Sequence, residues 1–353
     1  MSSVRILRLL VLGIGVALCT ECAPSSLAFL GPGRHAGVRK VKNSAAGQNL
    51  YVGSGWISEY RIGSNEPVRS VRAYYAAVAM ASDRKGHLFS ANGQPSYGAV
   101  SVYKRSTLEL VRQISTVAPL RLAVDHLGYL YVSNSGDAVL VYGEGGELVS
   151  VIRRGIRGAR DLAFSKSGEL FVANSHSVSI YTPTKVAGRM QYVRSITRGT
   201  SAPYAIALTS SADVAVANCL TCFSNETEKH DDVALFKQGA SSPYLILTSS
   251  IKRPVQIIAD NMGTLYVANS PFTAKGFQPG WVTEYKAGTS APSLKITEGI
   301  NEPVALALGP SGDLYVANQS GNSVTVYRPG EAKPIQEIKR GTHYPASLLF
   351  SMN

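Results

Sequence analysis

The sequence predicts an all-β fold, a seven-bladed β-propeller of four-stranded blades, with the ring closed by the C-terminal strand pairing with the first blade. Three observations predict it. An apolar pentad close to LYVAN recurs seven times, and its copies stand 38 to 51 residues apart. Turn residues and further strand signals follow each copy, with no helical period between them. The last residues of the chain repeat the form of the strand that precedes the pentad elsewhere.

Each repeat contains four candidate strands. The first is an apolar run that usually follows a proline, as at residues 204–208 and 304–308. The second is the pentad, at residues 50–54, 88–92, 130–134, 170–174, 214–218, 265–269 and 314–318. Because both faces of the pentad are apolar, its sheet is expected to pack between two others rather than to face water.

The third strand ends in an aromatic residue in every repeat, namely Tyr60, Tyr103, Tyr142, Tyr181, Phe236, Tyr285 and Tyr327. The fourth strand is more polar and carries many basic side chains, which is typical of an exposed edge strand. The first repeat has no convincing strand before its pentad, and residues 344–351 have the form of that missing strand. We therefore expect the C-terminal segment to complete the first blade.

The N-terminus indicates export. Arg5 and Arg8 precede an apolar run at 9–18 that is too short to span a membrane. We expect a signal peptide at 1–28, a flexible basic linker at 29–49, the propeller at 50–353, and no transmembrane span. Cleavage after Ala28 and lipidation at Cys19 or Cys22 both stay open. The protein is accordingly expected to be periplasmic, secreted or lipid-anchored to the cell envelope.

The net charge of +12 predicts an affinity for anionic surfaces. The alternative is that the basic side chains only solvate the outer rim of the ring. Export makes a nucleic-acid partner unexpected, and the chain is expected to be a monomer.

The repeat resembles a known family. The pattern P-x-x-[IL]-A-[ILV]-x-x-x-G-x-LYVAN, followed by VxVY, is similar to the NHL repeat and to its bacterial seven-bladed relatives, over residues 50–353. In those relatives the pentad commonly ends in Asp rather than Asn. The resemblance implies a β-propeller. It does not imply an activity, because such propellers include lactonases, lyases and pure binding modules.

Function is expected where the chain departs from its repeat. Six pentads end in Asn, and these side chains either cap their own turns or form a ring of amides at the channel mouth. The connections between the second and third strands are short in most repeats but long in the fifth, at 219–232, and in the sixth, at 270–281. Both are expected on the same face, where long loops on a rigid scaffold often bind ligands.

The fifth loop contains Cys219 and Cys222, which an exported protein is expected to join in a disulfide. A metal site that also uses His230, Asp231 and Asp232 is the alternative, and free thiols are another. Whether or not a metal binds, these three polar residues are candidate ligand contacts.

The sixth loop offers Phe272, Lys275, Phe277 and Trp281, a set of aromatic rings with a cation that suits a sugar ring or a protein partner. The alternative is a loop folded on its own aromatic rings. His176, in the corresponding loop of the fourth repeat, is a further candidate contact and could approach His230.

The sequence contains no GxSxG, no HExxH and no phosphate-binding loop. It therefore predicts a non-enzymatic binding or scaffold module that contacts a protein or glycan ligand through the two long loops. The alternative is a metal-dependent enzyme of the lactonase or lyase type, with its site at the central channel. No cofactor is expected, with a divalent metal in the channel left open.

Overall fold

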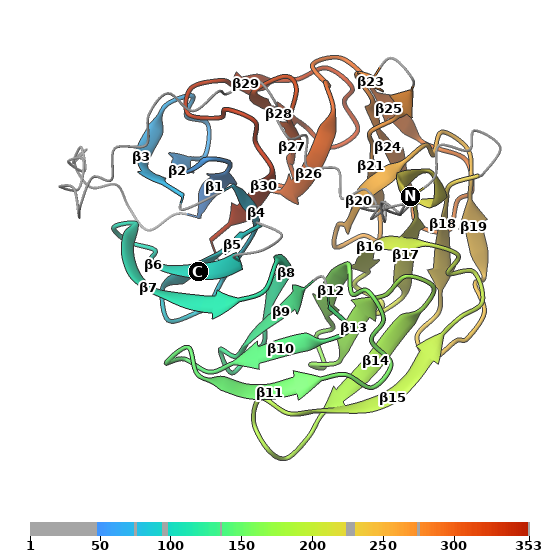
Figure 1. Ribbon diagram of the computed structural model, residues 1–353. Coiled ribbons are helices and arrows are strands. Elements are labelled where there is room, and N and C mark those ends of the chain that lie inside the picture. The colour runs from blue at the N-terminus through green and yellow to red at the C-terminus, as the bar shows by residue number, and fades with distance from the viewer. Residues whose placement is uncertain are drawn as a thin grey trace, which may run out of the picture.

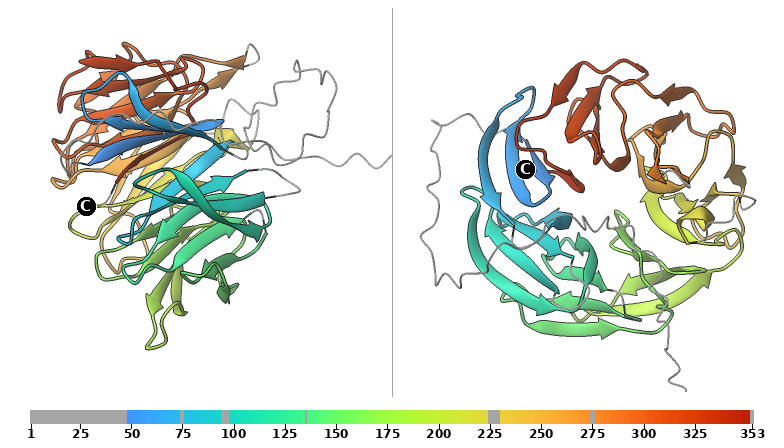
Figure 2. Two further views of the ribbon diagram at one scale, coloured as in Figure 1. Left: turned by 90° about the vertical axis from the view of Figure 1, so that its left-hand side faces the viewer. Right: turned by 45° about the horizontal axis from the view of Figure 1, so that its top comes forward.

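The computed structural model describes residues 48–73, 76–93, 98–134, 136–223, 230–273 and 276–351. These residues form seven four-stranded antiparallel sheets arranged as the blades of a propeller around a central channel (Figure 1). Figure 2 shows the ring edge-on and tilted, with the strand connections gathered on its two faces. The predicted fold class is therefore confirmed.

Each blade is given from the channel outward. Blades one and two consist of β30 (Ser347–Phe350), β1 (Asn49–Gly53), β2 (Trp56–Arg61) and β3 (Pro67–Arg72), and of β4 (Ala77–Ser82), β5 (His87–Asn92), β6 (Gly98–Lys104) and β7 (Glu109–Thr116). Blades three and four consist of β8 (Pro119–Val124), β9 (Leu130–Asn134), β10 (Val139–Tyr142) and β11 (Leu148–Ile152), and of β12 (Asp161–Phe164), β13 (Leu170–Ala173), β14 (Val178–Pro183) and β15 (Met190–Ile196).

Blades five and six consist of β16 (Pro203–Leu208), β17 (Val214–Asn218), β18 (Asp232–Phe236) and β19 (Leu245–Leu247), and of β20 (Pro254–Ala259), β21 (Leu265–Asn269), β24 (Trp281–Tyr285) and β25 (Leu294–Ile296). Blade seven consists of β26 (Pro303–Leu308), β27 (Leu314–Asn318), β28 (Ser323–Tyr327) and β29 (Gln336–Ile338). The loop of blade five adds the 3-10 helix η1 (Leu220–Cys222), and the loop of blade six adds the hairpin of β22 (Phe272–Thr273) and β23 (Gly276–Phe277).

The C-terminal strand closes the ring as predicted. β30 pairs antiparallel with β1, with Leu50 opposite Phe350 and Gly53 opposite Ser347. The hydroxyl of Ser347 also donates to the backbone oxygen of Ala77, at 2.7 Å, and so joins the first blade to the second. β1 begins at Asn49, the last residue of the predicted linker. Residues 1–47 lie outside the described residues, so the signal peptide and nearly all of the linker stay predictions.

Apolar side chains from facing sheets fill the space between neighbouring blades. Ala217 and Val233 of blade five form one buried cluster with Ile257 and Val267 of blade six. Both faces of each pentad strand are buried, which agrees with the expectation drawn from its two apolar faces. Among the described residues, no helix is long and apolar enough to cross a membrane.

In four blades the tyrosine at the end of the third strand links the blade to the connection before it. The hydroxyls of Tyr60, Tyr181 and Tyr327 each donate at 2.6 Å to a backbone oxygen in the connection that leaves the preceding blade. Tyr285 donates in the same way to Ser249. These bonds explain why the repeat keeps a tyrosine here, since a purely apolar contact would need only a ring.

The pentad asparagines bond inside their own blades. The amide oxygens of Asn174, Asn269 and Asn318 accept from a backbone N–H just before the innermost strand, at 2.9 to 3.2 Å. Their amide nitrogens donate at 3.0 Å to a serine or threonine hydroxyl on the third strand. Asn134, by contrast, caps its own turn by accepting from the N–H of Gly136. In these blades the buried amide therefore joins three strands of one sheet.

Replacing Tyr327 by Phe is expected to lower the free energy of unfolding by about 1 kcal/mol, because it leaves the backbone oxygen of Glu298 without its donor in a partly buried hydrogen bond. Urea unfolding of purified protein measures this. Tyr142→Phe is the matched control, since its hydroxyl makes no hydrogen bond among the described residues. An equal loss in both variants would contradict the role assigned to the tyrosine hydroxyl.

Alkaline pH is expected to weaken the fold. Burial raises to about 12 the pKa of Tyr60, Tyr181, Tyr266, Tyr285 and Tyr327. Between an unfolded value of about 10 and this folded value, the unfolded chain binds fewer protons, so stability falls as pH rises. Unfolding curves across that interval measure the fall. Constant stability, with tyrosinate absorbance already developed in the folded protein near pH 10, would count against it.

Candidate ligand-binding face

The long loops of blades five and six lie side by side on the same face, as predicted. Asp231, at the end of the first loop, accepts the backbone N–H of Arg253 at 2.6 Å. The guanidinium group of Arg253 then donates to the backbone oxygen of Ser270, at the start of the second loop, at 3.2 Å. Arg253, which directly precedes β20, therefore connects the two loops.

Cys219 and Cys222 form the predicted disulfide, with 5.3 Å between their Cα atoms. The bridge spans η1, and Cys219 is fully buried. Phe223 directly follows Cys222, so the disulfide restrains the backbone that carries the Phe223 ring. The alternatives of a metal-bound or free pair of thiols do not apply to this structure.

The polar residues that follow in the same loop have different surroundings. Asp231 is buried, and its carboxylate accepts from the N–H and the hydroxyl of Thr221 as well as from Arg253. Asp232 accepts from the amide of Asn218 at 2.6 Å, and burial raises the pKa of its carboxyl. His230 is exposed. Asp231 thus holds the loop, and His230 is the one of these three most open to a ligand.

The sixth loop presents its aromatic rings on a hairpin. Phe272 and Phe277 pair across β22 and β23, with ring centroids 5.0 Å apart and planes close to perpendicular. The Arg253 guanidinium carbon lies 4.9 Å from the Phe277 centroid and 5.7 Å from that of Phe272. Phe272 is still 51% exposed. Lys275 lies outside the described residues, so its predicted contact stays a prediction.

Trp281 and His176 stand apart from this hairpin in their contacts. The Trp281 indole N–H donates to the backbone oxygen of Ser250 at 2.8 Å, and the Lys295 ammonium group lies 4.0 Å from the ring centroid. His176 is exposed, and its Nδ1 lies 3.0 Å from the backbone oxygen of Ser201. Among the described residues, no three His, Cys, Asp or Glu side chains converge to hold a metal ion.

The structure adds functional candidates that sequence reasoning missed, at the starts of the innermost strands. The Arg160 guanidinium carbon lies 3.7 Å from the centroid of Phe223. The Tyr204 ring also lies next to Phe223, with its centroid 5.9 Å away. The same loop reaches Arg253, because Asp231 accepts the N–H of Thr221 and that of Arg253. Two arginines and a tyrosine from three adjacent blades therefore share one region.

Both guanidinium groups are partly removed from water. Burial lowers the pKa of Arg160 and of Arg253. The charge of Tyr204 opposes the shift at both arginines, and those of Glu302 and Asp231 oppose it at Arg253. The Nε of Arg253 is buried and has no acceptor among the described residues. Because arginine stays protonated at physiological pH, these groups carry desolvated positive charge rather than losing it.

A sequence signal for these residues does exist. In blade five the pairing of β16 with β17 shifts between Pro203 and Ala205, so Tyr204 is the extra residue of a β-bulge. The same bulge contains Val78, Leu120, Val255 or Val304 in blades two, three, six and seven. A bulge redirects its side chain. Tyr204 is therefore a polar residue at a position that is aliphatic in these four other repeats, and the sequence alone shows this difference.

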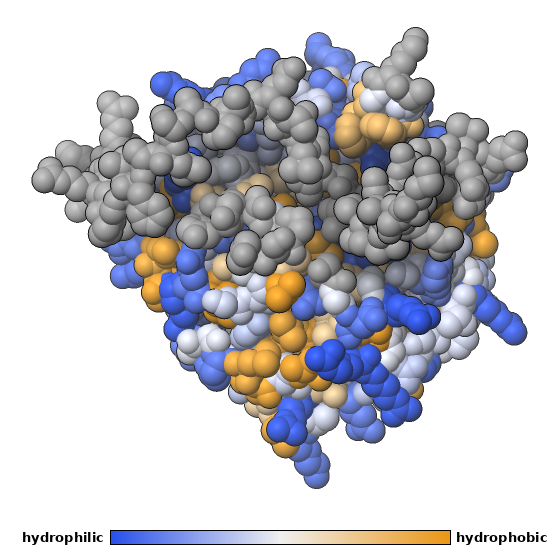
Figure 3. Space-filling view, in the orientation of Figure 1, coloured by the Kyte–Doolittle hydropathy of each residue, from blue (hydrophilic) through white to orange (hydrophobic). Residues whose placement is uncertain are grey.

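The space-filling view shows where apolar groups gather on this face. Figure 3 shows hydrophobic side chains over the β22–β23 hairpin, with hydrophilic groups prominent along the rim of the ring. The aromatic rings described above are the residues of that hairpin.

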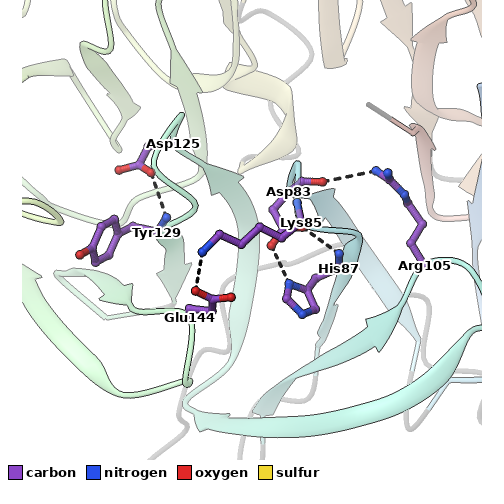
Figure 4. Close-up of polar contacts among 7 residues, drawn as sticks. All are labelled: Asp83, Lys85, His87, Arg105, Asp125, Tyr129 and Glu144. Atoms are coloured by element: carbon purple, nitrogen blue, oxygen red, sulfur yellow. Dashed lines mark hydrogen bonds and ion pairs between the residues drawn. The ribbon is translucent and has the colours of Figure 1, made fainter. Parts of the chain in front are cut away.

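The opposite face carries contacts that hold turns. Figure 4 shows Asp83 accepting the backbone N–H of Lys85 at 3.0 Å and both the N–H and ring Nδ1 of His87 at 2.7 Å. Lys85 forms an exposed ion pair with Glu144 of blade three, a contact that contributes little in water. Since these groups satisfy one another, this cluster is explained by blade structure.

Comparison with known proteins supports the fold. The sequence matches no protein-family model and no curated protein, so the resemblance to NHL repeats stays a prediction. A "putative 6-phosphogluconolactonase" from Bacteroides uniformis is 15% identical, with a TM-score of 0.69 over 86% of this chain and 99% of its own.

Two further solved structures have other names. A functionally unknown protein from Desulfotomaculum acetoxidans is 12% identical, with a TM-score of 0.68 over 86% of this chain and 99% of its own. Hydrazine synthase from Kuenenia stuttgartiensis is 16% identical, with a TM-score of 0.63 over 82% of this chain and 92% of its own. At these identities the likeness shows a shared β-propeller fold.

Proposed function

We propose that this protein is an exported, non-enzymatic binding module that captures a glycan or protein ligand on the loop face of blades five and six. The observation that carries the proposal is the placing of aromatic rings against guanidinium groups on that face. Phe223 covers Arg160, and the Phe272–Phe277 pair flanks Arg253. Aromatic faces beside cations contact sugar rings and protein side chains well.

The rigidity of this face supports binding. The disulfide anchors the start of the fifth loop, and Asp231 ties its end to the backbone of Arg253. The Phe272–Phe277 ring pair keeps the sixth loop folded as a hairpin. A surface that is ordered before binding loses less conformational entropy when a ligand arrives.

Export is part of the proposal and rests on the predicted signal peptide. The disulfide supports it, because structural disulfides persist mainly in oxidising compartments outside the cytosol. A periplasmic, secreted or lipid-anchored location would each meet this condition.

The rival proposal is a metal-dependent enzyme of the lactonase or lyase type. The names of structural neighbours from Bacteroides fit it, although likeness at 15% to 16% identity carries only the fold. Purified protein that retains one divalent ion per chain through dialysis would favour this rival over the binding module.

The test removes the aromatic rings of the loop face. Phe272→Ser with Phe277→Ser is expected to reduce binding about tenfold or more in a panel of dextran, polygalacturonate and poly-glutamate, because the stacking surface is lost. Biolayer interferometry measures the affinities.

The matched control is Met262→Ser, which removes an 84% exposed apolar side chain from a turn on the opposite face. Thermal unfolding shows whether the variants stay folded. Binding that survives loss of both rings, or that falls equally in the Met262 variant, would refute the assignment of this face.

A further inference from the structure

We propose that Arg160, Tyr204 and Arg253 form a carboxylate-binding site at the mouth of the central channel, and that it selects an acidic glycan bearing uronate groups. The inference rests on the proposed function, since it names the ligand class of the same face.

The three residues come together because of where they stand in the repeat. Arg160 directly precedes β12, and its backbone N–H donates to Ala173, the residue that pairs with Asp161. In blade five, Tyr204 likewise precedes Ala205, which pairs with Ala217. Arg160 and Tyr204 thus occupy equivalent positions in neighbouring blades, and Arg253 lies just before the inner strand of the next one.

Both arginines keep donors available. Arg160 donates to the backbone oxygen of Pro203 at 3.2 Å and reaches the hydroxyl of Ser175 at 3.5 Å. Arg253 donates through one terminal nitrogen to Ser270. Its Nε is buried, so a ligand would meet the terminal nitrogens instead. A guanidinium group has five N–H donors, so each arginine retains several for a ligand.

The neighbouring carboxylates do not use these donors. Among the described residues, neither guanidinium group forms an ion pair. Asp231 accepts from Thr221 and from a backbone N–H, and Glu302 accepts from the hydroxyl of Ser320. Asp161 accepts from the N–H groups of Leu162 and Ile206. Glu302 and Asp231 lie near enough to Arg253 to raise its pKa, but neither carboxylate bonds to its guanidinium group. An incoming carboxylate would supply the charge-assisted hydrogen bonds that these two do not make.

The geometry of the site is fixed before any ligand arrives. Arg253 has a positive φ of 49° immediately before Pro254, a conformation that is uncommon for a residue with a side chain. Asp231 holds its backbone at 2.6 Å. Arg160 is stacked 3.7 Å from the Phe223 centroid, on the ring that follows the disulfide. Such supported side chains bind an anion with little further ordering.

The surroundings favour a sugar as the carrier of the carboxylate. The half-exposed ring of Phe272 and the ring of Phe277 border Arg253, while Phe223 and Tyr204 border Arg160. Rings with apolar faces next to a cation fit a pyranose whose face stacks while its carboxylate binds the guanidinium group. An acidic peptide offers the carboxylate but no ring face of C–H groups that can stack on the aromatic side chains, so it is the less suitable ligand.

The experiment compares polygalacturonate, dextran and poly-glutamate as ligands of the purified full chain. The unaltered protein is expected to bind polygalacturonate more tightly than the other two. Arg160→Gln and Arg253→Gln are each expected to weaken that binding about tenfold or more, because each removes charge-assisted hydrogen bonds. Tyr204→Phe, which removes only a hydroxyl, is expected to weaken it by a smaller factor.

Arg198→Gln is the matched control, since it removes the same charge from an exposed position after β15. It should leave the affinity unchanged if the site, rather than the basic rim, binds the ligand. Thermal unfolding of each variant separates loss of binding from loss of fold, and Tyr204→Phe keeps the test valid if an arginine variant does not fold.

The outcomes separate this inference from the proposed function. Binding of dextran that depends on Phe272 and Phe277 but not on the two arginines would overturn the carboxylate site and leave the binding face in place. Tighter binding of poly-glutamate than of polygalacturonate would overturn the glycan assignment. Equal weakening by Arg198→Gln would assign the attraction to the rim.

Discussion

The pairing of β1 with β30 is the constraint on which the rest of the molecule depends. Every blade is apolar on both faces, so each face must be covered by a neighbour. An open row of blades would leave two such faces in water. Closure by the C-terminal strand covers the last two, since Leu50 and Val52 of the first blade pack with Tyr315 and Val324 of the seventh. The first and the last strand of the propeller therefore stabilise one interface between blades.

Closure also brings distant residues together. Bonds of the buried asparagines and tyrosines recur in several blades and fix where each inner strand begins. The side chain of the bulge residue, next to the start of the inner strand, makes no hydrogen bond that recurs from blade to blade. This residue can therefore differ between blades. Blade five has Tyr204 there, and in blade four Arg160 takes the equivalent place directly before β12. Blades two, three, six and seven have aliphatic residues in this bulge. The scaffold thus presents one variable position per blade around the channel mouth.

The architecture could be predicted because it repeats in the sequence, and the disulfide because its two cysteines are close in the chain. The site could be predicted only in part. Phe272 and Phe277 lie in a loop whose length departs from the repeat, and the structure puts both beside a cation as expected, although that cation is Arg253. The contact between Arg253 and Asp231 depends on how successive blades pack, which spacing along the chain does not reveal.

The distribution of polar residues explains why binding is expected beside the channel and not along its axis. If the channel itself were the site, polar bulge residues would be expected around the whole ring, as the repeat permits. Polar side chains at this place, Arg160 and Tyr204, occur instead in two adjacent blades, next to Arg253 and to the two long loops. Desolvated charge is stabilised most by a ligand that touches it directly and excludes water. A ligand held there would contact cations on the channel side and aromatic rings on the loop side. An acidic sugar can make both contacts, through its carboxylate and through the C–H groups on one face of its ring.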